Sequence, residues 1–366
     1  RLHEELTKSF IDKKISILAR GLKQDMDLET AVSEDNKVLI NEQYVGELKG
    51  LRFVIDFNSK NLDVDLKSIK KAARRGVEKE LIKRAKQIIN GGSLSINPES
   101  KIIWLNNPIA KIKKGENYLS PEIEIITDEA LPLDVKKELE QFIKNWLFSH
   151  INEILGSLIN LTKLKIENQY LRALSFQLYE DNGVLKRKHV DQIIKLISKE
   201  ERKKLWNMGI KIGRYHVFLP KMLKPKAVIL RTMLWKIYNN ISSDINIPKF
   251  GLNFVINENF NEKFLLLCGF ERFKNYFVRI DILEKLFIII IEKTIERKFK
   301  VSSEMMNLLG CSKENFFKLM DLMSYKKSKK TDTYYFAGEY KQNKEKIIIK
   351  KDKTNPFSKL LALNIK

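Results

Sequence analysis

The chain contains 366 residues, and its 68 Lys and Arg residues against 46 Asp and Glu residues give a formal net charge of +22. Two cysteines are too few for a disulfide scaffold or a four-cysteine zinc site, and no apolar run approaches the roughly 18 residues that cross a bilayer. Because no signal peptide is visible either, we expect a cytoplasmic protein with no membrane partner. The first residue is Arg1 rather than Met, so we expect a piece of a longer protein.

The positive charge has two interpretations. Lys and Arg neutralise phosphates and release counterions, so an excess of them suits a nucleic-acid partner. Yet Lys outnumbers Arg by 54 to 14, a bias typical of an AT-rich genome, and solvated helix faces usually carry lysines. The bulk charge alone therefore leaves both interpretations open.

The first third of the chain is expected to combine helices with two short β stretches. Apolar residues recur at helical spacing over 1–24, and again in a long basic helix over 62–89 that stops at two glycines. After each of these helices the apolar period changes to two, which predicts strands within 38–57 and 102–126. The two β stretches could pair into one small barrel or sheet.

The middle of the chain is predicted to be mainly helical. Helical spacing extends over 132–202 and includes one long apolar stripe over 139–158. A strand-like segment follows over 209–220, and Pro225 begins another helix. The turn-rich stretch over 239–251 is the best candidate for a domain boundary.

The C-terminal third alternates strands and helices up to residue 325. Ser302 and Ser312 are expected to begin two short helices, and Gly310 is expected to end the first of them. Two short helices joined by a tight turn resemble a helix-turn-helix or winged-helix core. The Lys-rich segment over 326–353 is expected to be a linker, followed by a short apolar tail.

Together these patterns predict an α+β fold that is predominantly helical, with small β modules, a helical middle and a winged-helix-like C-terminal unit. The expected divisions are a helix with a small β/helix module, a helical domain, the winged-helix-like unit, and the linker with its tail, over residues 1–130, 131–240, 241–325 and 326–366. No internal repeat is strong enough to indicate a solenoid.

Common catalytic and cofactor motifs are absent from the sequence. It contains no Gly-Lys dipeptide and no Gly-x-Gly, which disfavours a P-loop and a Rossmann nucleotide site. It also lacks Cys-x-x-Cys, His-Glu-x-x-His and Gly-x-Ser-x-Gly. The four histidines are far apart, and each is expected to be a surface or capping residue. We therefore assign no catalytic residue, metal site or cofactor to this chain, and an enzyme activity of its own is the least favoured interpretation.

Three basic clusters are the positive signals, over residues 70–84, 186–189 and 213–226. Adjacent arginine, tyrosine and histidine side chains in the third cluster can stack on bases while nearby lysines meet phosphates. Equally, the tyrosine could belong to the core and the lysines could simply be exposed.

Several segments, taken in order, resemble landmarks of a known family. They are RLHE at 1–4, VGELKGLRF at 45–53, WLFSHI at 146–151, GVL at 183–185, GIKIGRYHVFLP at 209–220, LKP at 223–225, FVRIDIL at 277–283 and NPFSKL at 355–360. This series resembles the region after the helicase core in alphaproteobacterial helicase-related proteins of superfamily 2, which are similar to the mitochondrial degradosome RNA helicase. The resemblance covers nearly the whole chain, although no single motif is diagnostic.

The resemblance implies a C-terminal accessory region of an ATP-dependent nucleic-acid helicase, with both RecA-like motor domains upstream. ATP and Mg would then belong to those motor domains, and no catalytic residue is carried over to this chain. The region would bind RNA or DNA and guide it for the motor. The residues expected to contact nucleic acid are Lys13, Lys14, Arg20, Arg74, Arg75, Arg187, Lys188, Arg214, Tyr215, His216, Lys221 and Lys224.

An alternative function is that of a protein-interaction scaffold. The apolar stripe over 139–158 and the tail over 354–366 would then dock a nuclease, a ribosome or the motor. No direct contact with nucleic acid would be needed in that case.

Overall fold

A computed structural model describes residues 29–40, 42–55, 63–163, 168–241, 246–257, 261–328 and 333–337. This part of the chain is mixed α and β, with more helix than strand. The helix expected over 1–24 and the apolar tail over 354–366 lie outside the described residues.

The N-terminal half is built from two meander units, each a small antiparallel sheet followed by one long helix. The first unit contains β1 (Thr30–Val32), β2 (Lys37–Ile40), β3 (Gln43–Lys49), β4 (Arg52–Ile55) and α2 (Asp63–Ile89). The second contains β5 (Leu94–Ile96), β6 (Lys101–Trp104), β7 (Asn107–Asn117), β8 (Ser120–Ile125) and α3 (Leu133–Lys163). Within the described residues the strands pair in chain order in two separate sheets, so the two β stretches do not pair into the single barrel or sheet that the sequence left possible.

The first three strands of the two meander units share one register at a constant offset of 64 residues. The β-bulge after Val38 recurs after Ile102, and left-handed backbone at Asn36 recurs at Ser100, with φ of 63° and 60°. In the β2–β3 pair the Cα partners include Lys37 with Glu47, Val38 with Gly46 and Ile40 with Gln43. In the β6–β7 pair the partners at the same positions are Lys101 with Lys111, Ile102 with Ala110 and Trp104 with Asn107. Shared irregularities at one offset indicate that the units are structural repeats, which the sequence did not reveal.

Each meander unit is joined to the next part of the chain by its last hairpin. The backbone carbonyl of Leu51, at the β3–β4 turn, accepts from the backbone N–H of Asp128 at 2.8 Å, beyond β8. The β7–β8 hairpin is longer and contributes the buried Leu119 to the core. Lys114 Nζ from this hairpin lies 4.9 Å from the ring centroid of Tyr238 in the C-terminal half.

The C-terminal half consists of three helix–strand units in the part of the chain that the structure describes. The first contains α4 (Gln169–Glu180), β9 (Val184–Lys186), α5 (Arg187–Leu196), α6 (Lys199–Asn207), β10 (Lys211–Ile212) and β11 (His216–Phe218). After a 3-10 turn, η1 (Pro220–Leu223), the second contains α7 (Pro225–Tyr238), β12 (Phe254–Ile256), α8 (Glu262–Leu267), β13 (Phe270–Phe273) and β14 (Tyr276–Arg279). The third contains α9 (Ile280–Glu292), β15 (Lys298–Phe299), α10 (Ser303–Leu309), α11 (Lys313–Leu322), β16 (Tyr325–Lys327) and β17 (Tyr334–Phe336).

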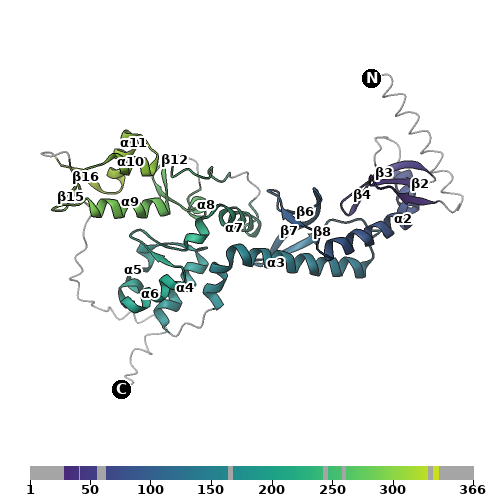
Figure 1. Ribbon diagram of the computed structural model, residues 1–366, viewed down its shortest axis with the longest axis horizontal. Helices are drawn as coiled ribbons and strands as arrows, with labels where there is room; N and C mark the ends of the chain where they lie inside the picture. Colours follow the sequence, from purple (N-terminus) through teal and green to yellow (C-terminus); the bar gives the residue numbers. More distant parts are fainter. Residues whose placement is uncertain are drawn as a thin grey trace, which may run out of the picture.

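The first and third helix–strand units have the same order of elements, which is helix, strand, helix, helix, strand and strand. In both, the last strand lies in the centre of a three-stranded antiparallel sheet, giving the orders β10-β11-β9 and β15-β17-β16. The second unit has the corresponding sheet order β12-β14-β13 but one fewer described helix. Figure 1 shows these units gathered at one end of the molecule, while the meander units extend along α3 to the other.

Helix α3 links the two halves through its buried face. The apolar stripe expected over 139–158 is confirmed, and α3 contacts α2, α4 and α7. Its buried residues are Leu139, Ile143, Leu147, Ile151, Leu155, Leu158 and Leu161. These residues belong to one hydrophobic cluster that extends from the first sheet to Leu234 in α7, so packing joins the meander units to the first helix–strand unit and to α7 of the second.

Local sequence signals predicted the two short helices of the third unit correctly, but the predicted end of this unit was wrong. Gly310 caps α10 with a left-handed φ of 65°, and Ser312 caps α11 by accepting from the backbone N–H of Asn315. The sheet continues into the segment expected to be a linker, because Lys326 lies in β16 and Tyr334–Phe336 forms β17. The turn-rich stretch over 239–251 connects α7 and β12 of the second unit.

Candidate functional site

The expected contact residues of the N-terminal half are only partly described. Lys13, Lys14 and Arg20 lie outside the described residues, as does the side chain of Arg75 in α2. Arg74 is exposed on α2. Further along the same helix, exposed Lys79, Lys83 and Lys86 border a shallow hollow of about 710 Å³ with Asn90 and Trp104.

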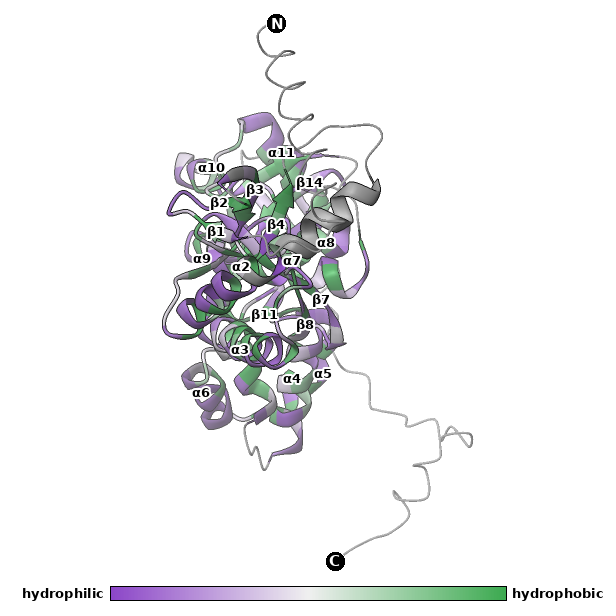
Figure 2. Cartoon of the chain, turned by 90° about the vertical axis from the view of Figure 1, so that its right-hand side faces the viewer, coloured by the Kyte–Doolittle hydropathy of each residue, from purple (hydrophilic) through white to green (hydrophobic). Residues whose placement is uncertain are grey.

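Helix α6 of the first helix–strand unit presents a basic surface. Ser198 caps its N-terminus in a capping box, since its hydroxyl accepts from the backbone N–H of Glu201 and the Glu201 carboxylate accepts from the backbone N–H of Ser198. Beyond the cap, Lys203 and Lys204 are exposed, and among the described residues neither takes part in an ion pair. Arg202 donates to the carbonyl of Ile194 at 2.9 Å and keeps an exposed side chain. Figure 2 shows α6 as a predominantly hydrophilic helix at the edge of the molecule.

An exposed tryptophan lies at the end of this basic helix. The side chain of Trp206 is 62% exposed, although tryptophan is highly buried on average. Lys211 Nζ, from β10, lies 5.5 Å from its ring centroid. Trp206 borders a pocket of about 410 Å³, together with Ser157, Asn207, Met208, Gly209, Lys211, Leu219, Pro220 and Lys221. Trp206 is not among the contact residues expected from the sequence, which include only Lys221 from this pocket.

The corresponding helix of the third unit, α11, has a different surface. Lys318 is paired with Glu314 at 2.6 Å, and Lys313 Nζ lies over the ring of Phe317 at 5.7 Å. Asp321 adds a further negative charge. The α6 surface is therefore the more favourable of the two for an anionic ligand.

The basic cluster at the start of α5 is held against the β10–β11 turn. The Arg187 guanidinium donates to the Gly213 carbonyl at 2.8 Å and to Asp191 at 3.3 Å. Its backbone N–H donates to the carbonyl of Tyr215 at 2.8 Å. Lys188 is exposed. Of the two expected contact residues in this cluster, Arg187 and Lys188, only Lys188 therefore directs its charged group mainly to solvent.

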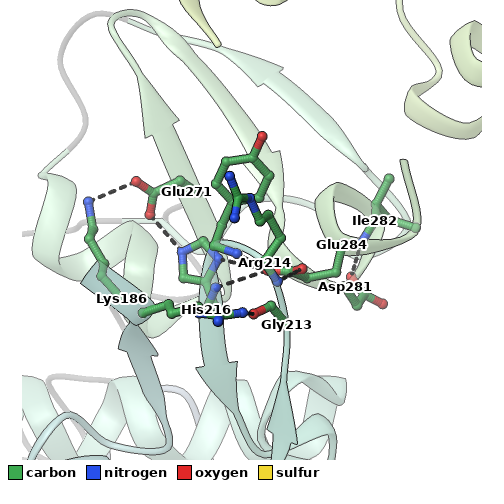
Figure 3. Close-up of polar contacts among 10 residues, drawn as sticks. Lys186, Gly213, Arg214, His216, Glu271, Asp281, Ile282 and Glu284 are labelled. Carbon is green, nitrogen blue, oxygen red and sulfur yellow. Dashed lines mark hydrogen bonds and ion pairs between the residues drawn. The ribbon is translucent and has the colours of Figure 1, made fainter. Parts of the chain in front are cut away.

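The β10–β11 turn is fixed by a carboxylate from the third unit (Figure 3). Glu284 of α9, which is buried, accepts the backbone N–H groups of Arg214, Tyr215 and His216 at 2.5, 2.8 and 2.9 Å. Successive backbone N–H groups form a concavity that suits an anion. A Cβ atom on Gly213 would lie 2.3 to 2.6 Å from the atoms of the Glu284 carboxyl group, which explains why glycine stands there.

A second set of ion pairs lies on the other side of the same turn. His216 Nε2 is 2.9 Å from Glu271 in β13, and Lys186 Nζ is 2.8 Å from the same carboxylate. Burial lowers the pKa of His216, but the hydrogen bond to Glu271 and the charges of Glu271 and Glu284 outweigh it and raise the pKa. Burial raises the pKa of Glu271, but His216 and Lys186 bring it below the ordinary value. The joint between the three helix–strand units is thus a buried charge network.

The expected stacking residues form part of this joint. His216 is 1% exposed, and Tyr215 is half-buried with its ring edge-on to Phe287 at 5.8 Å. Arg214 is exposed, and its guanidinium lies over the Phe287 ring at 5.5 Å. In this arrangement the two rings serve packing between units, and Arg214 alone of the three presents its side chain to solvent.

The remaining two expected residues lie at different places. Lys221 borders the Trp206 pocket, whereas Lys224 borders a separate cavity of about 310 Å³ near Phe250 and the Arg279–Asp281 ion pair. The structure therefore brings Arg187 close to Arg214–His216, and Lys221 close to α6.

Other site types find no support in the described ranges. No group of three or more His, Cys, Asp or Glu side chains among the described residues is arranged to hold a metal ion, and no helix there is long and apolar enough to cross a membrane. In comparisons with known proteins, no family profile, curated protein or solved structure matches the chain.

Proposed function

We propose that this chain is a nucleic-acid-binding accessory region of a superfamily 2 helicase, which binds RNA or DNA and guides it for motor domains outside this chain. The ordered series of segments that resembles such proteins supports the helicase context. ATP and Mg would act in the motor domains, since this sequence has no Gly-Lys dipeptide to form a P-loop. No step of ATP hydrolysis is therefore assigned to residues of this chain.

We further propose that the first and third helix–strand units are winged helices. Their shared order of elements and their sheets, with the last strand central, support this assignment. In a helix-turn-helix the second helix of the pair lies in the major groove. In the first unit that helix is α6.

The observation that carries the proposal is the exposed basic surface of α6. Lys203 and Lys204 are in no ion pair within the described residues, so no carboxylate there has to be displaced by a phosphate. Helix α6 has two acidic side chains, and one of them, Glu201, is bonded to the backbone N–H of Ser198 in the capping box. The charge of α6 is thus available to a partner, in contrast to that of α11.

A protein-interaction scaffold is the second candidate, and one observation favours it. Helix α9 and the residues after it expose Ile288, Ile291 and Ile295, at 54%, 55% and 77%. A contiguous apolar face on a surface helix is typical of a protein contact. This face belongs to the third unit, so both functions could be served by different units.

Binding of labelled RNA and DNA oligonucleotides across a salt series tests the proposal. Several phosphate contacts require the logarithm of the association constant to fall steeply with the logarithm of salt concentration. No measurable binding at low salt, or a slope near zero, would contradict a nucleic-acid function and favour the scaffold.

A further inference from the structure

We propose that the pocket beside Trp206 receives one nucleotide of a single-stranded nucleic acid, with its base stacked on the indole and its phosphate between Lys211 and Lys221. This inference rests on the proposed nucleic-acid function and names the class of ligand and the site. It differs from the sequence-based expectation, in which Arg214, Tyr215 and His216 were the residues that stack on bases or contact their edges.

The shape and lining of the pocket suit a single nucleotide. Its volume of about 410 Å³ lies near the lower end of the roughly 300–1,000 Å³ that is usual for small-molecule sites. Trp206 and the apolar side chains of Met208, Leu219 and Pro220 line one part of it, whereas lysines supply charge. An aromatic platform next to cations is the arrangement by which proteins hold single strands without reading a particular sequence.

One residue that borders the pocket has a buried polar atom without a partner. The Ser157 hydroxyl oxygen, from α3, is buried and makes no hydrogen bond among the described residues. Leaving such a group unpaired costs about 1–3 kcal/mol in a folded protein. Rotation of the Ser157 side chain toward the pocket would let a ring nitrogen or carbonyl of a base accept from this hydroxyl, which would remove that cost.

The two lysines provide charge that can move. Lys211 Nζ lies over the indole at 5.5 Å, and its side chain is exposed, so the ammonium group can leave the ring when a base arrives. Lys221 precedes Met222, whose side chain is fully buried, which fixes the backbone from which Lys221 extends. A phosphate adjoining a stacked base would lie within reach of these ammonium groups.

The test compares fluorescently labelled single strands with and without bases by anisotropy, using the full chain. With a 12-residue oligothymidylate, Trp206→Ala is expected to weaken binding about ten-fold, and Trp206→Phe is expected to retain most of the affinity, because stacking on one aromatic ring contributes about 1–3 kcal/mol per base. With a 12-residue abasic strand, Trp206→Ala and wild type are expected to bind equally. Phe176→Ala is the matched control, since Phe176 is 58% exposed on α4 of the same unit, and it is expected to change neither affinity.

The outcomes separate this inference from the proposed function. Wild-type binding that Trp206→Ala leaves unchanged, or weakens equally with and without bases, would overturn the nucleotide site while leaving a basic interface. Wild-type protein that binds neither strand, and none of the RNA and DNA oligonucleotides of the salt series, would overturn the proposed function itself. Because Trp206 is largely exposed, Trp206→Ala is expected to keep the wild-type melting temperature, which shows that a lost affinity is not a loss of folding.

Discussion

His216 and Glu284 are joined through both the backbone and the ring of the histidine. The His216 backbone N–H donates to Glu284 Oε1 at 2.9 Å, and Nδ1 of the ring lies 3.6 Å from the same oxygen. That second distance is too long for a hydrogen bond but short enough for a strong interaction of charges. One carboxylate of α9 therefore holds the β10–β11 turn and stabilises the charged form of its histidine.

Replacing Gly213 by alanine is expected to destabilise the joint. The added Cβ would collide with the Glu284 carboxyl group at 2.3 to 2.6 Å, and overpacking of this kind typically costs about 1–3 kcal/mol. Urea unfolding of the full chain measures the change. Gly156→Ala in α3 is the matched control, because its Cβ would meet only Asn152 at 3.8 Å and helix interiors favour alanine by about 0.5–1 kcal/mol. Equal stability of the two variants would refute the close packing at Gly213.

The joint is expected to lose stability as pH rises. The pKa of His216 is raised in the folded protein, so the protonated ring stabilises the fold fully below its unfolded pKa of about 6.5. That contribution disappears as pH rises through the higher folded pKa. The free energy of unfolding of wild type, measured between pH 6 and 9, should fall more than that of His216→Gln. Parallel curves for the two proteins would show that the pKa of this histidine is the same in the folded and unfolded states, which would contradict the account.

Arg231 is expected to be the most sensitive single residue of the C-terminal half. It is 0% exposed, and its guanidinium donates to the carbonyls of Asn182, Met222 and Leu267. Arg231→Ala would leave these buried acceptors unpaired, at about 1–3 kcal/mol for each. Arg231→Lys is expected to rescue little, because one ammonium group cannot span the geometry of a guanidinium. Full recovery by lysine in thermal unfolding would contradict this account.

Tyr118→Phe is expected to leave the protein as stable or to stabilise it by up to about 1 kcal/mol. Tyr118 lies in the long β7–β8 hairpin, and its hydroxyl is buried without a hydrogen bond among the described residues. Removing an unpaired buried polar atom removes its desolvation cost. A melting temperature well below that of wild type would reveal a partner for this hydroxyl.

Sequence patterns predicted correctly those helices and strands that are specified by neighbouring residues in the chain. The helix expected over 62–89 is α2 over Asp63–Ile89, because a long run of helix formers ends at two glycines. Strands β1 and β5 were missed, since three residues carry too little period-two pattern. The meander repeat was missed as well. At the 64-residue offset only Lys37 with Lys101 and Lys49 with Lys113 are identical within the first three strands, and register depends on turns and burial more than on identity.

The candidate site was harder to predict than the fold. Whether Tyr215 and His216 stack on a ligand or pack inside depends on Glu271 and Glu284, which are 55 and 68 residues away from His216 in sequence. The signal for Trp206 was weak but present, because it follows a run of basic residues and precedes a glycine turn. Only the fold places Lys211 and Lys221 beside it.

The salt dependence of oligonucleotide binding by Lys203→Ala/Lys204→Ala tests the central claim most directly. Each lost phosphate contact is expected to reduce the log-log salt slope by about 0.7 to 0.9, so this variant should bind more weakly and with a shallower slope than wild type. Lys313→Ala/Lys318→Ala on α11 removes the same charge from the corresponding helix and should match wild type. Equal slopes for all three proteins, or a slope near zero for wild type, would contradict a nucleic-acid interface on α6.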